Sequence, residues 1–305
     1  MGLSNFPNGI TSFGIPIYGP GQGHDISGKT FFVDANVLTS GGDGKSWDTA
    51  YKTIAVGLAA SQAQISKSSN RAWAKRNTVY YCGDDIKETL VLAAEKTDLI
   101  GVGTDINSLP KVTGNFTIGI ARSGFRIINM GFIPTTTAPV ITFPSGMHGW
   151  ELHGVHLFKV LSVTNSAMLL STDCRDFRLI NSYIYPDVNA AVATIGFNIA
   201  GTATGLGRAI IDGCLICGAT ALNVVDTSAY YEGALCKNTI LKATALCVDD
   251  NSDSILFVDN RLISAGAITD SDGTGIADWN LNLICNNYCH AVDADGPIPA
   301  LQAPA

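Results

Sequence analysis

The chain has 305 residues, which is long enough for one large core or for two domains. Charged residues make up only 15% of it and 32 residues are glycine, a composition typical of an ordered, β-rich protein and not of a disordered one. The formal net charge of -7 argues against a nucleic-acid-binding protein, which normally presents a basic face. No apolar run has the length of a membrane span, and the N-terminus lacks the basic start and apolar core of a secretory signal, so we expect neither.

Residues 1–29 are predicted to form an extended N-terminal arm. The segment is rich in Gly and Pro, yet it carries apolar side chains along its length, namely Phe6, Ile10, Phe13, Ile15 and Ile17. An extended arm cannot bury these side chains alone, so we expect it to attach to the surface of another protein. The alternative is a strand that folds back onto its own domain.

Residues 30–292 form the predicted folded domain, which begins with apolar residues suited to a strand. A helix is expected near residues 47–60, because apolar side chains recur there at helical spacing: Tyr51, Ile54 and Leu58. Its expected N-cap is Ser46 or Asp48. A helix at this place would cover the open end of a repetitive β-structure, whose terminal strands otherwise expose unpaired edges.

Four segments follow one another in this region: GDGKSWDTAYKTI from Gly42, VYYCG from Val79, ETLVL from Glu88 and LIGVG from Leu99. Their order resembles the N-terminal cap and first coils of the pectate-lyase-like right-handed β-helix superfamily. Together with the NFPNGITSFGIP arm, residues 3–132 look like bacteriophage proteins that join such an arm to a β-helix. The resemblance carries no catalytic signature. It implies a virion protein, on the capsid or a fibre, that is made in the cytoplasm of a bacterial host.

From Phe125 onward the chain repeats one pattern at intervals of 22 to 32 residues. Apolar residues stand four and two positions before an Asn or Gly, which is typical of strands with one buried face. The repetition predicts the stacked coils of an all-β, right-handed parallel β-helix. Asn side chains at its left-handed corners predict a ladder of stacked amides: Asn129, Asn181, Asn238, Asn260 and Asn287. The alternative is an irregular β-sandwich whose strands are similar by chance.

The position three residues before each corner is expected to point outward. In the later coils it holds an apolar stripe that predicts a subunit interface: Ile210, Leu235, Phe257 and Ile284. Fibres and spikes that resemble this fold are commonly trimers, so we expect a homotrimer. Alternatively, the insertion between residues 181 and 213 or an extended C-terminal tail at residues 293–305 covers the stripe within one chain.

The sequence predicts no active site, metal or cofactor. One position before the corners, Asp212, Lys237 and Asp259 fall on consecutive coils, which favours a cross-coil salt bridge over a catalytic carboxylate pair. The DSDGTG segment from Asp270 begins like a calcium loop but lacks the final bidentate Glu, so a weak calcium site stays open. A single CxxC, Cys214 to Cys217, is weak evidence for zinc, and we expect both thiols to pack in the core.

We therefore expect a non-enzymatic structural protein of a phage virion, a capsid decoration or a fibre, anchored to other virion proteins through its arm. Neither nucleic acid nor a membrane is an expected partner. Two alternatives stay open on the same fold. One is a tail-spike-like polysaccharide depolymerase, which would need clustered carboxylates. The other is a module that binds a host glycan without cleaving it.

Overall fold

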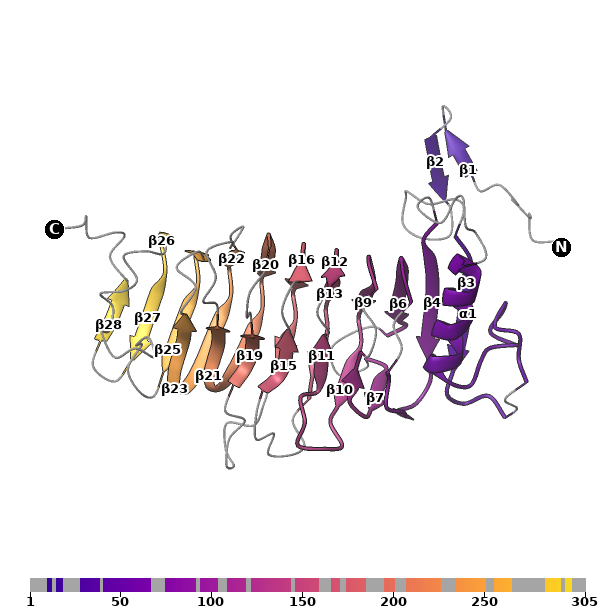
Figure 1. The fold of residues 1–305 in the computed structure, drawn as a ribbon, viewed down its shortest axis with the longest axis horizontal. Coiled ribbons are helices and arrows are strands. Elements are labelled where there is room, and N and C mark those ends of the chain that lie inside the picture. Colours follow the sequence, from indigo (N-terminus) through magenta and orange to yellow (C-terminus); the bar gives the residue numbers. More distant parts are fainter. Residues whose placement is uncertain are drawn as a thin grey trace.

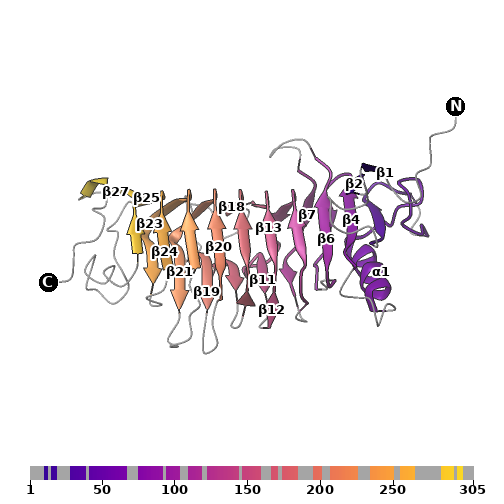
Figure 2. The same ribbon diagram turned by 90° about the horizontal axis from the view of Figure 1, so that it is seen from above.

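The protein is a parallel β-solenoid, seen here in a computed structural model (Figure 1). The structure describes residues 10–12, 15–18, 28–38, 41–66, 75–91, 94–103, 109–118, 122–143, 146–158, 166–170, 174–184, 195–200, 207–225, 234–250, 255–264, 283–291 and 294–297. Strands from successive coils pair in parallel along the long axis of the molecule, as the repeated pattern predicted (Figures 1 and 2).

One face of the solenoid is a ten-stranded sheet in which each coil supplies one strand. Its strands in chain order are β3 (Thr30–Asp34), β4 (Asn77–Cys82), β6 (Thr97–Gly101), β9 (Arg126–Ile128), β13 (Glu151–His153), β17 (Arg178–Ile180), β20 (Ala209–Asp212), β22 (Ala234–Lys237), β24 (Ile255–Val258) and β26 (Leu283–Cys285). All pair in parallel with their neighbours, and each from β4 onward is followed in the chain by a strand of the second face.

The second face consists of β5 (Ile86–Lys87), β7 (Lys111–Thr113), β10 (Gly131–Ile133), β14 (His156–Leu157), β18 (Tyr183–Ile184), β21 (Leu215–Val225), β23 (Ile240–Asp250), β25 (Arg261–Ser264) and β27 (Tyr288–Ala291). β28 (Ala294–Pro297), within the expected tail, pairs antiparallel with β27 and so covers the last parallel edge. A third run of strands follows β7, β10, β14 and β18 in the chain: β8 (Phe116–Thr117), β11 (Ile141–Phe143), β15 (Ser166–Leu170) and β19 (Ile195–Ala200). The short strands β12 (Met147–His148) and β16 (Cys174–Arg175) pair with each other.

The core is a set of side-chain columns that run inside the coils. The residue four positions before each of the first four corners from Asn129 is buried, as the pattern predicted: Phe125, Trp150, Phe177 and Ala209. Phe125 and Trp150 lie with ring centroids 5.0 Å apart, and Phe143 lies 5.4 Å from Trp150 and 5.6 Å from Phe177. Large rings from adjacent coils thus pack on one another, and burying each of them stabilises the fold by about 1.5–3 kcal/mol.

One helix, α1 (Ile54–Ser66), packs against β3 and β4 at the N-terminal end of the solenoid (Figure 1). It begins at Ile54, later than the predicted start near residue 47, and Thr53 is its N-cap because its Oγ1 accepts the Val56 N–H at 3.4 Å. The Glu88 carboxylate also accepts the N–H groups of Ile54 and Ala55, at 3.0 and 2.9 Å. A side chain from the next coil therefore fixes where the helix starts, and this long-range contact is invisible to local spacing. Among the described residues, no helix has the length and apolarity needed to cross a membrane.

The described part of the N-terminal arm is a small hairpin and not a single extended strand. β1 (Ile10–Ser12) and β2 (Ile15–Tyr18) pair antiparallel, and neither pairs with a strand of the solenoid. Ile10, Ile15 and Ile17 lie in these two strands, whereas Phe6 and Phe13 lie outside the described residues.

Candidate functional site

The corners of the solenoid carry their polar residues in two columns, where the sequence predicted one. Asn129, Asn181 and Asn238 stand at the left-handed corners, with φ of 57°, 47° and 50°. In the last two coils the corner is one residue earlier than predicted, at Asp259 and Asn286, with φ of 55° and 54°. Asn260 and Asn287, predicted to stand at the corner, follow it and are buried.

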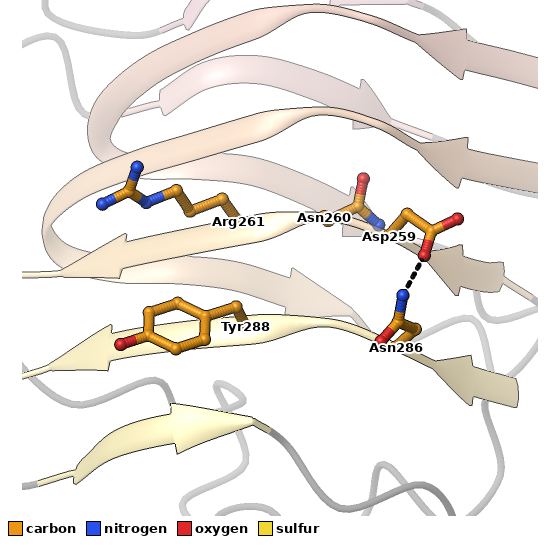
Figure 3. Close-up of a pocket in the computed structure, with 5 residues that line it drawn as sticks. All are labelled: Asp259, Asn260, Arg261, Asn286 and Tyr288. Atoms are coloured by element: carbon orange, nitrogen blue, oxygen red, sulfur yellow. Dashed lines mark hydrogen bonds between the residues drawn. The ribbon is translucent and has the colours of Figure 1, made fainter.

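The corner amides bond to the coil before them and do not form the predicted amide-to-amide stack. Asn129 Nδ2 donates to the carbonyl oxygen of Gly101 at 2.9 Å, and Asn238 Nδ2 donates to Asp212 Oδ1 at 3.0 Å. Asn286 Nδ2 donates to Asp259 Oδ1 at 2.5 Å (Figure 3). These links tie each corner to its neighbour on the outside of the solenoid.

The residues after the last three corners, Thr239, Asn260 and Asn287, form an inner ladder that sequence reasoning missed. Asn260 Oδ1 accepts the Thr239 N–H at 2.9 Å, and Asn287 Oδ1 accepts the Asn260 N–H at 2.8 Å. Thr239 Oγ1 accepts the Cys214 N–H at 3.3 Å. The sequence does contain a sign of this inner ladder. Asp259–Asn260 and Asn286–Asn287 each place two residues suited to a left-handed corner next to each other, so the side chain of the second can point inward.

The shifted corner corrects the predicted interface stripe. Phe257 pairs with Cys236 and Ile284, and its side chain is buried with 1% exposure. The stripe position on β24 belongs instead to Leu256, which pairs with Leu235 and Leu283. Phe257 therefore leaves the predicted interface, because the corner at Asp259 moves each side chain of this strand to the opposite face. The side chain of Ile284 lies outside the described part of the structure.

An outer band of half-buried aliphatic side chains crosses the ten-stranded sheet: Ile100, Ile128, Ile180, Ile210, Leu235 and Leu256. On β6, β9 and β17 the band residue stands one position before the corner of its coil. On β20, β22 and β24 it stands three positions before the corner, so the band shifts by two residues between β17 and β20. Charged residues of both signs flank it: Arg126, Glu151 and Arg178 share one column, and Lys237 Nζ lies 3.1 Å from Asp212 Oδ2. This last contact confirms the predicted cross-coil salt bridge between these two residues. Asp259 is not part of it, because Val258 pairs with Lys237.

Several described carboxylates serve the structure. Asp98 is buried between two guanidinium groups, with its Oδ1 2.5 Å from Arg76 Nη1 and 2.6 Å from Arg126 Nε. The hydrogen bond to Asp98 raises the pKa of Arg126 further. On the surface, Arg208 forms a two-point pair with Asp176, at 2.7 and 2.9 Å, which lowers the pKa of that carboxyl. Each of these pairs joins two coils or the loops beside them.

The cysteines with described environments are free thiols. Cys214 and Cys217 are buried, as predicted, and burial raises the pKa of each to about 11. Among the described residues, no three His, Cys, Asp or Glu side chains gather in a way that could hold a metal ion. The predicted weak calcium segment from Asp270 lies outside the described residues.

A shallow depression of about 570 Å³ lies at the corner between β24 and β25, and it continues onto the next coil at β27. Asp259, Asn260, Arg261, Asn286 and Tyr288 line it (Figure 3). The side chains of Arg261 and Tyr288 lie beside each other on adjacent strands, and Asp259 and Asn286 face each other at the corner. The depression thus combines an exposed ring, a guanidinium group and hydrogen-bonding amide and carboxylate groups.

Comparison with protein-family models, with curated proteins and with solved structures finds no match to this chain. The geometry defines the class of protein, a parallel β-solenoid. The resemblance of residues 3–132 to phage β-helix proteins stays a prediction from the residues.

Proposed function

We propose that this chain is a non-enzymatic structural protein of a phage particle, a rod that assembles side by side with further copies of itself as a homotrimer. The observation that carries the proposal is the outer band, Ile100, Ile128, Ile180, Ile210, Leu235 and Leu256, on the outward face of the ten-stranded sheet. The band has two parts, on β6, β9 and β17 and on β20, β22 and β24, and apolar surface repeated along a rod favours a partner that is itself long and repetitive. Another copy of this chain has both properties.

The charges beside the band favour a second copy over an unrelated partner. The column Arg126, Glu151, Arg178 alternates in sign, and Asp212 and Lys237 add one charge of each sign on the next coils. A face with both signs can match a rotated copy of itself, which is the arrangement that a closed cyclic assembly requires. The phage assignment is supported by the residue resemblance and by the apolar arm, which gives such a rod a means of attachment.

Light scattering coupled to size-exclusion chromatography tests the assembly. We expect the wild type to run with the mass of three chains at micromolar concentration. The double variant Ile210→Lys, Leu235→Lys should run as a folded monomer, because six lysines would meet in the closed trimer. Val102→Lys is the matched control, since Val102 is 49% exposed and lies off the band, and it should leave the trimer intact.

A wild type that is monomeric at these concentrations contradicts the assembly.

The proposal that the protein is not an enzyme is tested by a separate assay. Incubation with anionic polysaccharides should release no new reducing ends, and a time-dependent release would overturn that part and favour a depolymerase.

A further inference from the structure

Positive charge gathers at the corner where the chain enters the ten-stranded sheet in the first four coils. Each of these coils places basic residues just before, or at the start of, its strand (β3, β4, β6 or β9): Lys29, Lys75, Arg76, Lys96, Arg122 and Arg126. We call these six residues the entry patch. The Lys29 carbonyl oxygen accepts the Thr78 N–H at 2.9 Å. The Lys96 carbonyl oxygen accepts the Asn77 N–H, and the Lys96 N–H donates to the Ser123 carbonyl oxygen, both at 2.9 Å. These bonds hold the segments of the patch side by side along the axis of the solenoid.

The entry patch differs in charge from the rest of the molecule. It lies on four short segments: residues 28–29, 75–76, 94–98 and 122–126. In these segments the six basic residues are accompanied by two carboxylates, Glu95 and Asp98. The rest of the chain holds the other 24 of the 26 carboxyl groups but only 13 of the 19 lysines and arginines. A chain with a formal net charge of -7 therefore carries a region of local positive charge at the N-terminal end of its solenoid.

Asp98 fixes the positions of two guanidinium groups of the patch. Its Oδ1 accepts from Arg76 Nη1 at 2.5 Å and from Arg126 Nε at 2.6 Å, and its Oδ2 accepts from Arg126 Nη2 at 2.5 Å. The Asp98 side chain is 4% exposed, whereas those of Arg76 and Arg126 are 27% and 31% exposed. One carboxylate balances only one of the two positive charges. Because each guanidinium group has five N–H groups, both keep donors for a second anion.

Gly124 and Arg122 add space and a further cation beside this pair. Gly124 stands at a left-handed corner with φ of 67°, and a Cβ at this position would lie 3.3 Å from Arg76 Nη2. Arg122 Nε is buried and has no hydrogen-bond partner among the described residues, and Arg122 Nη1 lies 3.7 Å from Glu95 Oε1. Arg122 is therefore only weakly paired within the described part of the chain.

We propose that the entry patch binds an acidic segment of a partner protein through its carboxylate side chains. Guanidinium groups bind carboxylates with two parallel hydrogen bonds, and those of Arg76 and Arg126 are held in place before any partner arrives, which lowers the entropy cost of binding. The patch extends over four coils, or about 15 Å, which suits a short acidic segment. A long polyanion such as a nucleic acid fits less well, because beyond the patch it would meet the excess of carboxylates on the rest of the rod.

The place of the patch relates it to attachment. Lys29 belongs both to the patch and to the arm, and its N–H donates to Asn77 Oδ1 of β4 at 2.8 Å. A partner bound here would lie at the end of the rod where the arm begins. Charged contacts steer and orient an encounter more than they hold it, so the patch complements the apolar side chains of the arm. That the partner is a virion protein rests on the proposed function, whereas the carboxylate chemistry of the site does not.

Fluorescence anisotropy with three labelled probes tests the patch: decaglutamate, decaglutamine and a thymidine decanucleotide. At about 50 mM salt we expect decaglutamate to bind with a Kd of about 0.1 mM or tighter, and decaglutamine not to bind. Lys96→Glu with Arg122→Glu should weaken the binding of decaglutamate about tenfold or more. Lys52→Glu with Lys87→Glu is the matched control, because it makes the same change in charge at two exposed lysines of the N-terminal coils outside the patch. The control should change the Kd by less than about twofold.

The outcomes separate the site from its alternatives. Decaglutamate that does not bind, or that binds the folded patch variant as tightly as the wild type, overturns the proposal. An equal loss in the control variant also overturns it, since net charge alone would then explain the binding. Tighter binding of the decanucleotide than of decaglutamate assigns the patch to nucleic acid and not to a protein.

Circular dichroism establishes that each variant is folded. If the patch variant does not fold, Arg122→Gln measured against Lys52→Gln replaces it. The assay uses the purified full-length chain without particles, so a failure here is distinct from a failure of the trimer or of the phage assignment.

Discussion

At four corners of the solenoid, a side chain of the following coil accepts the backbone N–H of the residue after the corner: those of Val155, Cys214, Thr239 and Asn260. Asn260 illustrates the arrangement: its Oδ1 accepts the Thr239 N–H and its Nδ2 donates to the Cys236 carbonyl oxygen at 2.8 Å. Asn260 is 2% exposed, so water cannot substitute for either bond. The Asn260 side chain therefore links its own coil to the backbone of the preceding coil.

This geometry predicts different outcomes at two Asn residues. Asn260→Ala should lower the free energy of unfolding by about 1–3 kcal/mol for each buried group left without a partner. Asn238→Gly is the comparison, because Asn238 is an exposed corner residue with φ of 50°, a backbone conformation that glycine adopts easily. Urea unfolding followed by circular dichroism measures both. Equal effects at the two positions would contradict the inner ladder.

His156 makes the stability depend on pH in a defined direction. Burial lowers its pKa below the ordinary value of 6.5, and the nearby positive charge of Lys111 lowers it further. Phe158 and Tyr183 pack beside the imidazole ring, with ring centroids 3.8 and 5.8 Å from it. The unfolded chain therefore takes up the proton at a higher pH than the folded one, so stability present above 6.5 is lost as the pH falls from there through the folded pKa.

The test compares melting temperatures of the wild type and of His156→Gln at about pH 7.5 and about pH 5. The wild type should lose more stability between these two pH values than the variant does. His153→Gln is the control, since His153 lies in the preceding strand, β13, and is more accessible to water. Identical losses in wild type and His156→Gln would show that another group controls the acid sensitivity.

At the scale of single elements, helix α1 depends on a carboxylate outside its own sequence. Both oxygens of Glu88 accept N–H groups from the first turn of α1, where the helix dipole favours a negative charge. Glu88→Ala should destabilise this end by about 1–2 kcal/mol, and Glu88→Gln by less, because it keeps one acceptor. Hydrogen exchange of the first-turn amides of α1 measures the effect locally. Unchanged protection in Glu88→Ala would contradict the capping role.

The strand β24 shows how far the sequence determines an element and where it does not. Apolar residues at the repeated positions correctly predicted a strand in this coil. The corner was misplaced because Asp259 and Asn260 both suit a left-handed turn, and local sequence does not rank them. Burial decides between them: a corner at Asp259 turns Phe257 inward, whereas a corner at Asn260 would bury the smaller Val258 instead. Ranking the two alternatives by buried side-chain size would have found the observed register.

The depression beside Arg261 and Tyr288 was beyond sequence reasoning for a related reason. Tyr183, Arg261 and Tyr288 are separated by long stretches of chain, and only the register of β18, β21, β23, β25 and β27 places them in one column. That register depends on the corner position, which the repeated Asn residues did not define in the last coils. The coils could be predicted because the apolar pattern of each coil is local in sequence. A column that crosses several coils can be predicted only when the length of every coil between its members is assigned correctly.

At the scale of the whole molecule, the hairpin of the arm pairs with no strand of the rod, and Lys29 at the end of the arm donates its N–H to Asn77 Oδ1 of β4. β1 and β2 pair only with each other, while α1 and β3 close the N-terminal end with buried side chains such as Val33, Ile54 and Leu58. The first parallel pairing of the rod, between β3 and β4, begins at Thr30. We therefore expect the solenoid to fold without residues 2–20.

Deleting residues 2–20 should leave the melting temperature and the oligomeric mass of the protein unchanged, because no described strand pairing or core contact of the rod is lost. Attachment should be lost, since each large apolar side chain that the arm buries in a partner contributes about 1.5–3 kcal/mol. Phe6→Ser with Phe13→Ser in the full-length chain is the finer variant, and it should reduce attachment without removing backbone. Incorporation is measured by purifying particles assembled with each variant and quantifying the bound protein. Normal incorporation of the deletion would show that the rod itself, and not the arm, makes the attachment.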